Sequence, residues 1–595
     1  MMSVRIARLL PIAFVAAFQP ILSAAYPLPM VPTTVIDRPG NGIGALSIMG
    51  SGFGTPGNGS SVKVIYRITT SQKQQTFNST SGAIRLWNDT RIILTFNRSW
   101  FVISASVTTP AGKSAQIPTD VYELNSYPTN SPYPLAMTID AANRVFIDPE
   151  YHLDLEAYTP QSNVVAGLNY PVSPRPGVFD NPLDGVPGQV SFPSQTSNAG
   201  EDVIVDPNGK AWFTEGGAPT TPTTRSVANH SRIVSYDPST QAFGVYNIPG
   251  DDNQVMGVAW DRGRQRLWFS EQARAVNCGV FGCTVALPPR LTSFDPTQIP
   301  TNNSFTFPTT GLTCNGGSST TVGSCSNVPA RPCVTVNDCV LVDQVCPEDS
   351  GSDSTCYHEY ALPSTPRSGG AAHMVVDSSG TVWFTAYNGG NYIGRLDPST
   401  GNVSVYPLPK PNQPSCFASG PWQIAVANDG NIVFTEYFDN EVGRFLVANV
   451  GNPACLALDS NGQNPFMQTL TIPGAVLQCN VCLCTTNCPS CPGAQSVHSL
   501  AVDGVGNVWF TQGGPASDPT TTTSIGYIRA DWSGIVLLPS MSLDPIGSTS
   551  HGDCGVPLGA FVSFNGAGIS VNPNTGDIWF VNYCRGQLDY LHKMS

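Results

Sequence analysis

Seven copies of one phrase constrain the fold of this 595-residue chain more than any other feature. Each copy is a short apolar run, an acidic or amide residue, a turn that contains Gly, and an aromatic-rich run. Asp or Asn shortly before Gly is turn chemistry, because Gly accepts φ > 0 and the Asx side chain bonds the nearby backbone. β-branched and aromatic residues make the flanking runs strands. Each copy therefore predicts a β-hairpin, and the copies begin at Pro134, Glu201, Met256, Ala372, Trp422, His498 and Ala567.

The fourth copy continues into a complete four-stranded unit. AHMVVD, which starts at Ala372, is followed by TVWFTAY, YIGRLD and NVSVYPLP, with a turn after each run. Four antiparallel strands in about forty residues form one blade of a β-propeller, and a blade must bury both faces against its neighbours. The sequence therefore predicts an all-β chain with a seven-bladed propeller over residues 134–593. The recurring aromatic residues are predicted to pack between blades rather than to form a cofactor site; they are Phe146, Trp212, Trp268, Trp383, Phe434, Trp509 and Trp579.

The last copy reaches Ser595 after three strands. Since propellers protect their sheet edges, the fourth strand of this blade is expected to come from chain just before or within the first blade. Charged residues make up only 12% of the chain, while Gly (57) and Pro (52) are abundant. This composition fits a turn-rich all-β protein.

The region before the repeats has a different pattern. It contains ALSIMGSGFGTPGNGSSVKVIY, AIRLWNDTRIILTF and SASVTTPAGKSAQIPTDVYEL, which resemble an IPT/TIG domain. The resemblance implies a small immunoglobulin-like β-sandwich over residues 31–125, in which the GxGFG phrase makes a tight turn. Such modules mediate contacts or act as spacers. Residues 126–133 are predicted to be a linker to the propeller.

The N-terminus predicts the compartment. Arg5 and Arg8 precede an apolar run, and small residues follow at 23–25, so residues 1–25 are predicted to be a secretory signal peptide. A retained signal anchor is the alternative, but the run is shorter than the roughly 20 apolar residues of a membrane span. The product is expected to be secreted, extracellular and not inserted in a membrane. Sequons that predict a glycoprotein lie at Asn58, Asn78, Asn88, Asn97, Asn229, Asn302 and Asn402.

A net charge of −13 without any Lys/Arg cluster argues against a nucleic-acid partner. All 17 cysteines lie at or after Cys278. In an oxidising compartment most are expected to form disulfides, within two Cys-rich inserts at about 297–360 and 455–495. Five cysteines at residues 479–491 also have spacings that suit zinc, although secretion favours a disulfide knot. Two further disulfides are predicted around single blades, Cys416 with Cys455 and Cys554 with Cys584.

The repeat resembles that of a known family. TVWFTAYNGGNYIGRLDPSTGNVSVYPLP and NIVFTEYFDNEVGRF are similar to the repeat of the streptogramin B lyases (virginiamycin B lyase), and the resemblance covers residues 134–593. It implies a seven-bladed propeller that holds a divalent ion, usually magnesium, by carboxylates. In that family the ion polarises an ester carbonyl and a histidine removes the Cα proton, so that a lactone opens by elimination.

Register arithmetic predicts that the two ends of each hairpin meet at one rim of the propeller. It pairs the first residue of each hairpin with a residue near its end, and many of these residues are polar. The predicted pairs are Glu201 with Glu215, Met256 with Glu271, Ala372 with Ala386, Trp422 with Glu436, His498 with Gln512, and Ala567 with Asn582.

Carried over onto this sequence, the family pattern makes His498 the candidate general base. The metal carboxylates fall at Ser496 and Gln512, and a second family histidine falls at Trp422, so that a hard cation loses its charged ligands. Glu436, Glu215 and Glu271 are an alternative set of carboxylates elsewhere on the rim, although carboxylates at a rim are commonly just solvated. His373 is expected one position later than the site, on the opposite strand face.

Two functions from different classes follow. One is a secreted, glycosylated propeller with a binding or scaffold role toward an extracellular ligand or protein, and with a diverged rim site. The alternative is a carbon–oxygen lyase that opens a cyclic ester with Mg²⁺ as cofactor. A shared fold does not settle function. The missing metal ligands favour the binding or scaffold role.

Overall fold

The structure is a computed structural model. It describes residues 33–37, 43–49, 53–68, 71–88, 91–97, 99–109, 112–113, 121–128, 134–149, 155–158, 177–178, 202–215, 232–240, 242–248, 255–272, 274–279, 282–297, 311–317, 323–327, 332–333, 357–363, 370–386, 391–409, 420–437, 439–460, 462–472, 496–513, 525–538, 541–542, 562–563, 566–582 and 587–593. Within these ranges the fold is built from strands, with two short 3-10 helices at η3 (Val447–Asn449) and η4 (Pro453–Leu456). No helix among the described residues is long and apolar enough to cross a membrane.

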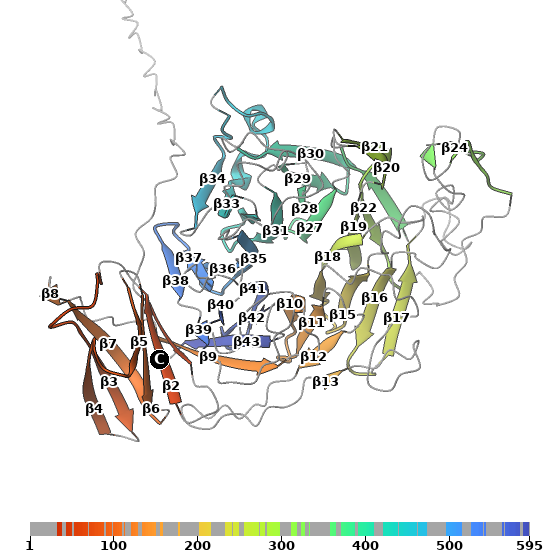
Figure 1. Cartoon of the computed structure of the whole chain (residues 1–595). Helices are drawn as coiled ribbons and strands as arrows, with labels where there is room; N and C mark the ends of the chain where they lie inside the picture. Colours follow the sequence, from red (N-terminus) through yellow and green to blue (C-terminus); the bar gives the residue numbers. More distant parts are fainter. Residues whose placement is uncertain are drawn as a thin grey trace, which may run out of the picture.

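The N-terminal region forms two sheets that share one core (Figure 1). The first sheet contains β1 (Thr33–Asp37), β2 (Ile43–Met49), β6 (Arg91–Asn97) and β5 (Ile84–Trp87). The second contains β4 (Ser71–Asn78), β3 (Ser61–Ile68), β7 (Phe101–Thr109) and β8 (Gly112–Lys113). Alternate residues of β3 are buried, as expected for a strand with one face toward a core. Trp100 stacks on Tyr66 with ring centroids 3.7 Å apart, inside this core.

The repeated hairpins form four-stranded antiparallel sheets, each in chain order, that stand around a centre (Figure 1). The first three are β10 (Pro134–Ile139), β11 (Val145–Pro149), β12 (Glu156–Tyr158), β13 (Gly177–Val178); β14 (Val203–Val205), β15 (Ala211–Glu215), β16 (Arg232–Asp237), β17 (Ala242–Asn247); and β18 (Val255–Asp261), β19 (Arg266–Glu271), β22 (Arg290–Phe294), β26 (Tyr357–Ala361). The next three are β27 (Ala371–Val376), β28 (Val382–Ala386), β29 (Tyr392–Asp397), β30 (Asn402–Pro407); β31 (Pro421–Val426), β32 (Ile432–Glu436), β33 (Glu441–Phe445), β34 (Met467–Thr471); and β35 (Ser496–Val502), β36 (Val508–Gly513), β37 (Ile525–Ile528), β38 (Ile535–Leu538). This is a propeller-like arrangement.

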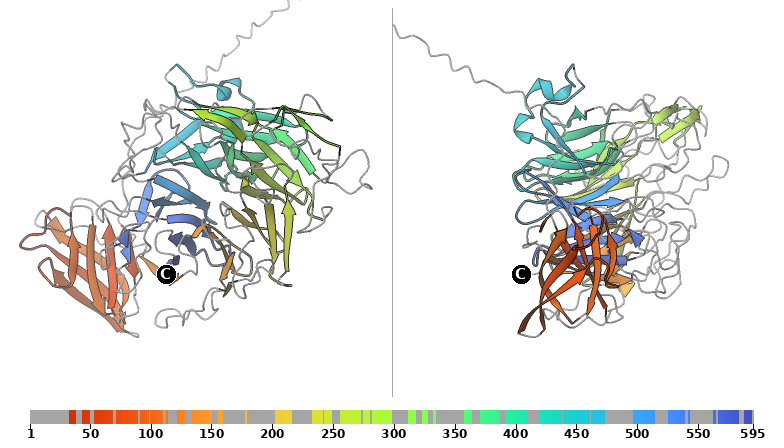
Figure 2. Two further views of the ribbon diagram at one scale, coloured as in Figure 1. Left: turned by 45° about the vertical axis from the view of Figure 1, so that its right-hand side comes forward. Right: turned by 60° about the vertical axis from the view of Figure 1, so that its left-hand side comes forward.

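The C-terminal hairpin is completed by a strand from the other end of the repeat region. β41 (Gly566–Val571), β42 (Ile578–Asn582) and β43 (Gln587–Lys593) are followed in the sheet by β9 (Val121–Pro128), which pairs antiparallel with β43. The expectation that chain just before the first repeat supplies this strand is therefore confirmed. β9 also pairs in parallel with β1, so one eight-stranded sheet joins the N-terminal region to the repeats (Figure 2). Residues 126–128, predicted as linker, are the end of this strand.

Neighbouring sheets share apolar clusters, and the recurring aromatic residues lie in them. All seven predicted aromatic residues are at most 3% exposed, which confirms packing as their role. Trp383, for example, contacts Phe445 of the next sheet at 5.7 Å between ring centroids. The last and first sheets also share a cluster, which includes Trp579, Ala567, Leu135 and Met137.

The turn residues that mark each repeat are tied to these aromatic residues. The carboxylate of Asp206 accepts hydrogen bonds from the turn amides of Asn208 and Lys210 and from Nε1 of Trp212, the last at 3.0 Å. Asp377 and Asp503 bond Trp383 and Trp509 in the same way, at 2.8 Å and 2.9 Å. One Asp therefore fixes both the turn and the indole orientation, which explains why Asp, Gly and Trp recur together.

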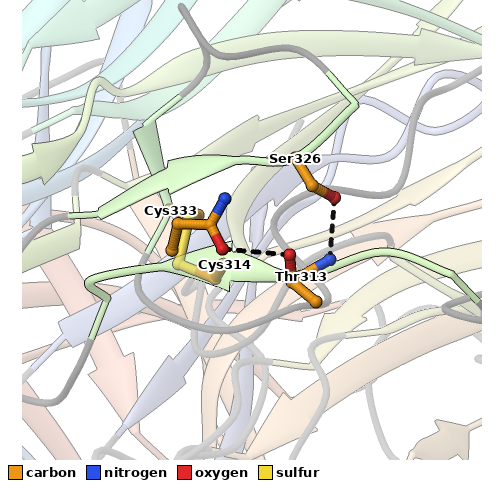
Figure 3. Close-up of a disulfide and its surroundings, with 5 residues drawn as sticks. Thr313, Cys314, Ser326 and Cys333 are labelled. Atoms are coloured by element: carbon orange, nitrogen blue, oxygen red, sulfur yellow. Dashed lines mark hydrogen bonds between the residues drawn. A yellow bond between two sulfur atoms is a disulfide. The ribbon is translucent and has the colours of Figure 1, made fainter.

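Smaller sheets lie outside the four-stranded sheets. Two of them have two strands each: β20 (Arg274–Gly279) with β21 (Gly282–Leu287), and β39 (Met541–Ser542) with β40 (Val562–Ser563). One has three strands: β23 (Cys314–Asn315), β24 (Gly323–Cys325) and β25 (Pro332–Cys333). The last group lies in the first Cys-rich insert and contains a disulfide between Cys314 and Cys333 (Figure 3). Beside it, the Thr313 amide donates to Ser326 Oγ at 2.9 Å. The first insert is thus bridged internally, as expected.

The predicted bridge between Cys416 and Cys455 is wrong. Cys455 is a buried free thiol that donates to the Asn449 carbonyl at 3.1 Å, in the turn that η3 and η4 form. Its side chain packs into the cluster between the fourth and fifth four-stranded sheets of the repeats, so it serves as a small apolar residue. Cys416, Cys554, Cys584 and residues 479–491 lie outside the described residues, as do residues 1–25 and two sequons, Asn229 and Asn302. Four of the other sequons are exposed, and Asn88 is half-buried.

Candidate functional site

The first strands of the repeats do not pair in simple alternation with the second strands. In β31, Pro421 lies opposite Glu436 and Ile424 lies opposite Phe434, so Trp422 and Gln423 together face one residue, Thr435. The same shift occurs in β18, β27, β35 and β41. A β-bulge of this kind adds one residue and re-aims the side chains beside it.

The bulge corrects the predicted rim pairs. The residues opposite Glu271, Ala386, Glu436, Gln512 and Asn582 each lie one position earlier than the register arithmetic predicted, at Val255, Ala371, Pro421, Val497 and Gly566. The predicted pairs require an unbroken hydrogen-bond ladder between the first and second strands of each hairpin. The extra residue in each of these five first strands shifts the strand register by one residue. Glu201 and the side chain of Glu215 lie outside what the structure describes.

A series of hydroxyl groups holds these bulges in place. Thr435 Oγ1 accepts from the Gln423 amide at 3.0 Å and donates to the His498 carbonyl of the next sheet at 3.0 Å. Thr511 repeats this pattern between Ser499 and Ala567. Thr385 does so between His373 and Trp422, and Ser270 between Gly257 and Ala372. Each hydroxyl thus joins the bulge of its own sheet to the bulge of the next one.

The bulges surround a narrow cavity of about 20 Å³, here called the axial cavity. Its polar wall consists of Asp202, His373, Trp422, Gln423, His498 and Ser499. Its apolar wall includes Leu135, Met137 and Ile569. These residues come from β10, β27, β31, β35, β41 and the residue before β14, so the cavity lies where the first strands converge. Space for about one water-sized group is available inside.

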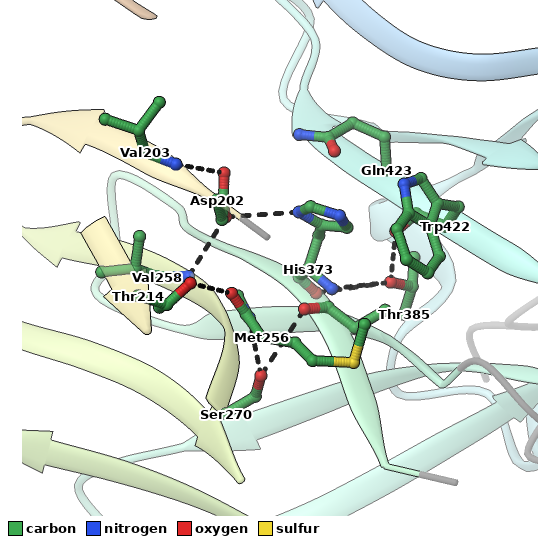
Figure 4. Close-up of polar contacts among 12 residues, drawn as sticks. Asp202, Val203, Thr214, Met256, Val258, Ser270, His373, Thr385, Trp422 and Gln423 are labelled. Atoms are coloured by element: carbon green, nitrogen blue, oxygen red, sulfur yellow. Dashed lines mark hydrogen bonds and ion pairs between the residues drawn. The ribbon is translucent and has the colours of Figure 1, made fainter. Parts of the chain in front are cut away.

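Asp202 and His373 form a buried pair in this wall (Figure 4). Nδ1 of His373 lies 3.2 Å from Oδ2 of Asp202, at ion-pair distance although outside hydrogen-bond geometry. The Asp202 carboxylate also accepts from the amides of Val203 at 3.0 Å and Val258 at 3.1 Å. Two backbone donors therefore satisfy both carboxylate oxygens of Asp202, a residue that is 8% exposed.

His498 also lies beside Trp422. The ring centroids of His373 and His498 are 5.0 Å and 5.8 Å from that of Trp422, and Tyr437 lies 5.9 Å from His498. Nδ1 of His498 is 3.0 Å from Ser499 Oγ. Burial, with a smaller effect from His373, lowers the pKa of His498 to about 4. His498 is therefore neutral at ordinary pH, because the surrounding protein disfavours its charged form.

Both histidines thus line the same cavity. His373 was expected on the opposite strand face from the site, since residues 372 and 373 would alternate in a regular strand. The bulge between Ala371 and Met374 removes that alternation and brings His373 to the wall.

The positions to which the resemblance to streptogramin B lyases assigns metal ligands do not suit a hard cation. Gln512 is neutral and fully buried, and its Nε2 donates to Asn440 Oδ1 of the preceding sheet at 2.8 Å. Asn440 in turn donates to the Ile472 carbonyl at 2.9 Å. The side chain of Ser496 lies outside the described residues. Since Mg²⁺ requires charged oxygen ligands in near-octahedral geometry, the described donor set does not fit it.

Two of the alternative carboxylates are buried rather than solvated. Glu436 is 1% exposed. Glu271 is also 1% exposed and accepts from Thr292 Oγ1 at 2.6 Å in its own sheet. The described residues contain no group of three or more metal-ligating side chains. Asn582 is fully buried, and neither of its amide atoms has a hydrogen-bond partner within the described part of the chain.

A larger cleft of about 530 Å³ lies at the turn end of two hairpins, between β18–β19 and β27–β28. One of its polar side chains, Arg264, joins the two sheets. Arg264 contacts Asp261 at 2.8 Å and donates to the Gly380 carbonyl at 2.8 Å. The axial cavity, where buried polar side chains from several sheets converge, is therefore the better candidate for a functional site.

No family model matches the chain, and no curated protein matches it. Among solved structures, a streptogramin B lyase is 16% identical, with 80% of this chain and 98% of that chain covered and a TM-score of 0.43. A catalytically inactive virginiamycin B lyase from Staphylococcus aureus with quinupristin is 15% identical, with 80% and 100% covered and a TM-score of 0.42. An auxiliary nutrient binding protein from Bacteroides thetaiotaomicron is 7% identical, with 95% and 98% covered and a TM-score of 0.33.

Sequence reasoning missed Asp202 and the bridging hydroxyls. Asp202 is 171 positions before His373, and nothing in either repeat copy indicates that the two meet. The hydroxyls did have a signal, because Thr or Ser follows the second aromatic position in several copies, as in WFT and VFT. A small hydroxyl residue that recurs inside an apolar strand indicates a hydrogen bond that is repeated between units.

Proposed function

We propose that this chain is a secreted, glycosylated binding protein. Its four-stranded sheets, with the sheet that β9 completes, are the seven blades of one propeller, and an immunoglobulin-like IPT/TIG domain precedes them. The axial cavity binds an extracellular ligand through hydrogen bonds and aromatic contacts rather than through a metal. The shared clusters between successive sheets, and between the last and the first, support the closed ring.

The observation that carries this proposal is the state of Gln512. The streptogramin lyase pattern requires an anionic metal ligand at this position. Here an amide stands there, and its Nε2 is engaged with Asn440. A neutral, buried side chain held by the preceding sheet contributes no charge to a divalent ion.

The state of His498 points in the same direction. A general base works best when its pKa lies near the operating pH. With its pKa lowered to about 4, His498 accepts a proton poorly, although it remains a good hydrogen-bond partner. Two observations still favour the lyase alternative. The repeat resembles that of the streptogramin B lyases, and a histidine, His498, stands at the position of their general base.

A turnover assay separates the two functions. Purified full-length protein is incubated with a cyclic depsipeptide lactone and Mg²⁺, and ring opening is followed by mass spectrometry. We expect no opening above the buffer rate, with or without EDTA. Opening that needs Mg²⁺, stops with EDTA and falls by about 10²–10⁴ in His498→Ala would establish the lyase instead.

Secretion and glycosylation have their own test. Expression of the full chain in a eukaryotic host should yield protein in the medium whose mass falls on treatment with an N-glycosidase. Asn78 is exposed on β4, so Asn78→Gln should remove one glycan. Protein retained in the cell, or a mass unchanged by the glycosidase, would contradict this part of the proposal.

A further inference from the structure

We propose that the axial cavity receives a hydroxyl group of a neutral carbohydrate, with the sugar ring against Trp422. This inference rests on the proposed binding function and names the class of ligand. It follows from four properties of the cavity wall: an unpartnered imidazole nitrogen, a carboxylate that already accepts from two backbone amides, a small volume, and an aromatic ring that contacts two histidines.

The first property is the orientation of His373. Its side chain is 3% exposed, and Nδ1 is turned toward Asp202. Figure 4 shows the second ring nitrogen on the side away from Asp202, toward Trp422. This atom, Nε2, is buried without a hydrogen-bond partner among the described residues. Buried polar atoms are nearly always satisfied, so an unpartnered one at a cavity indicates a bound group or water.

The second property is the charge of the wall. Asp202 is its one acidic side chain among the described lining residues, and its two carboxylate oxygens already accept hydrogen bonds from the amides of Val203 and Val258. Both oxygens are thus engaged within the protein rather than directed only at a ligand. An anionic ligand would be repelled by the Asp202 carboxylate, and the described wall contains no lysine or arginine to offset this repulsion. A neutral ligand fits best, since burying an uncompensated charge is unfavourable.

The third property is size. A cavity of about 20 Å³ admits one water-sized group rather than a ring. A hydroxyl has this size, and it both donates and accepts a hydrogen bond, so it pairs with a histidine nitrogen in either tautomer. The rest of such a ligand must lie outside the cavity, over its mouth.

The fourth property is the aromatic ring that would contact the rest of the ligand. Trp422 is half-buried, and the rings of His373 and His498 lie near it. Gln423, also half-buried, is adjacent in the wall. An apolar ring face bordered by hydrogen-bonding groups matches a sugar, which presents C–H groups on one face and hydroxyls around its edge.

The test uses named probes and the full-length protein. An array of neutral oligosaccharides (cello-, xylo-, manno- and chito-oligosaccharides) is probed with the fluorescently labelled protein, beside uronate and sulfated glycans and neutral tripeptides. Hits are measured in solution by calorimetry. His373→Gln and Trp422→Ala are compared with Trp532→Ala, which removes a partly buried tryptophan that stacks on Arg444 away from the cavity. Thermal unfolding confirms that each variant is folded, and Trp422→Phe replaces any variant that is not.

We expect at least one neutral oligosaccharide to bind. His373→Gln should weaken binding by about three- to tenfold, as for one hydrogen bond, and Trp422→Ala by more than about tenfold. Trp532→Ala should change nothing. Binding of peptides alone, or preference for charged glycans, would overturn the carbohydrate assignment while leaving a binding function intact. Absence of glycan binding, or binding that all three variants retain, would also overturn it. Failure of the proposed function itself appears separately, as Mg²⁺-dependent lactone opening.

Discussion

Replacing Thr511 with valine removes a hydroxyl that joins two sheets at the axial cavity. Thr511 is 1% exposed, and its Oγ1 accepts from the Ser499 amide at 3.2 Å and donates to the Ala567 carbonyl at 2.7 Å. Valine has nearly the same shape but leaves both backbone groups buried and unpaired. Each unpaired group costs about 1–3 kcal/mol, and the two losses share one site. The free energy of unfolding should therefore fall by about 2–4 kcal/mol.

Equilibrium unfolding in urea measures this loss. The midpoint of the transition should move to lower urea with the slope unchanged, because the native fold is kept. The matched control is Thr469→Val, the same chemical change at a half-buried position of β34. A surface substitution of this kind changes stability by about 0.5 kcal/mol or less. If Thr511→Val costs no more than Thr469→Val, the hydroxyls do not hold the bulges and the reasoning fails.

Three further predictions concern other parts of the repeat region. Burial, with a smaller effect from Glu441, raises the pKa of Asp439 from 3.8 to about 7. The folded state therefore binds more protons than the unfolded state, so the free energy of unfolding should fall by at most about 4 kcal/mol as pH rises from about 4 to about 7. Asp439→Asn should abolish this fall, and a variant whose stability depends on pH as the native protein's does would contradict the prediction. A Cβ at Gly257 would meet the backbone of Ala372 and His373. Gly257→Ala should therefore lower the midpoint temperature of unfolding by several degrees. An unchanged midpoint in calorimetry would refute this close approach of the two backbones. Cys455 is fully buried, so Ellman's reagent should modify it only after unfolding, and modification in the native protein would show that the site is open.

The sequence predicted the strands because each repeat copy carries its own turn and its own packing residues. Asp377 and Trp383, six positions apart, form a hydrogen bond within one hairpin, so a local pattern contains the information. The closing strand was predictable for a different reason, since three strands leave an unpaired edge that another segment must cover.

The candidate site was predicted less well because it depends on features that are not local. A bulge shifts Trp422 and Gln423 by one residue relative to an ideal ladder, and no residue type in β31 requires it. The contact of Asp202 with His373 joins two sheets that are not neighbours in the chain. The family pattern identified His498 and Gln512, but it contained no information on the amide of Asn440 that engages Gln512.

Titration calorimetry with Mg²⁺ is the most direct test of a neutral axial cavity. The native full-length protein and a Gln512→Ala variant are titrated at neutral pH after removal of divalent ions. We predict no saturable heat for the native protein up to about 1 mM Mg²⁺, where any functional site for this ion would be occupied. One-to-one saturable binding by the native protein, lost in Gln512→Ala, would contradict a metal-free binding site.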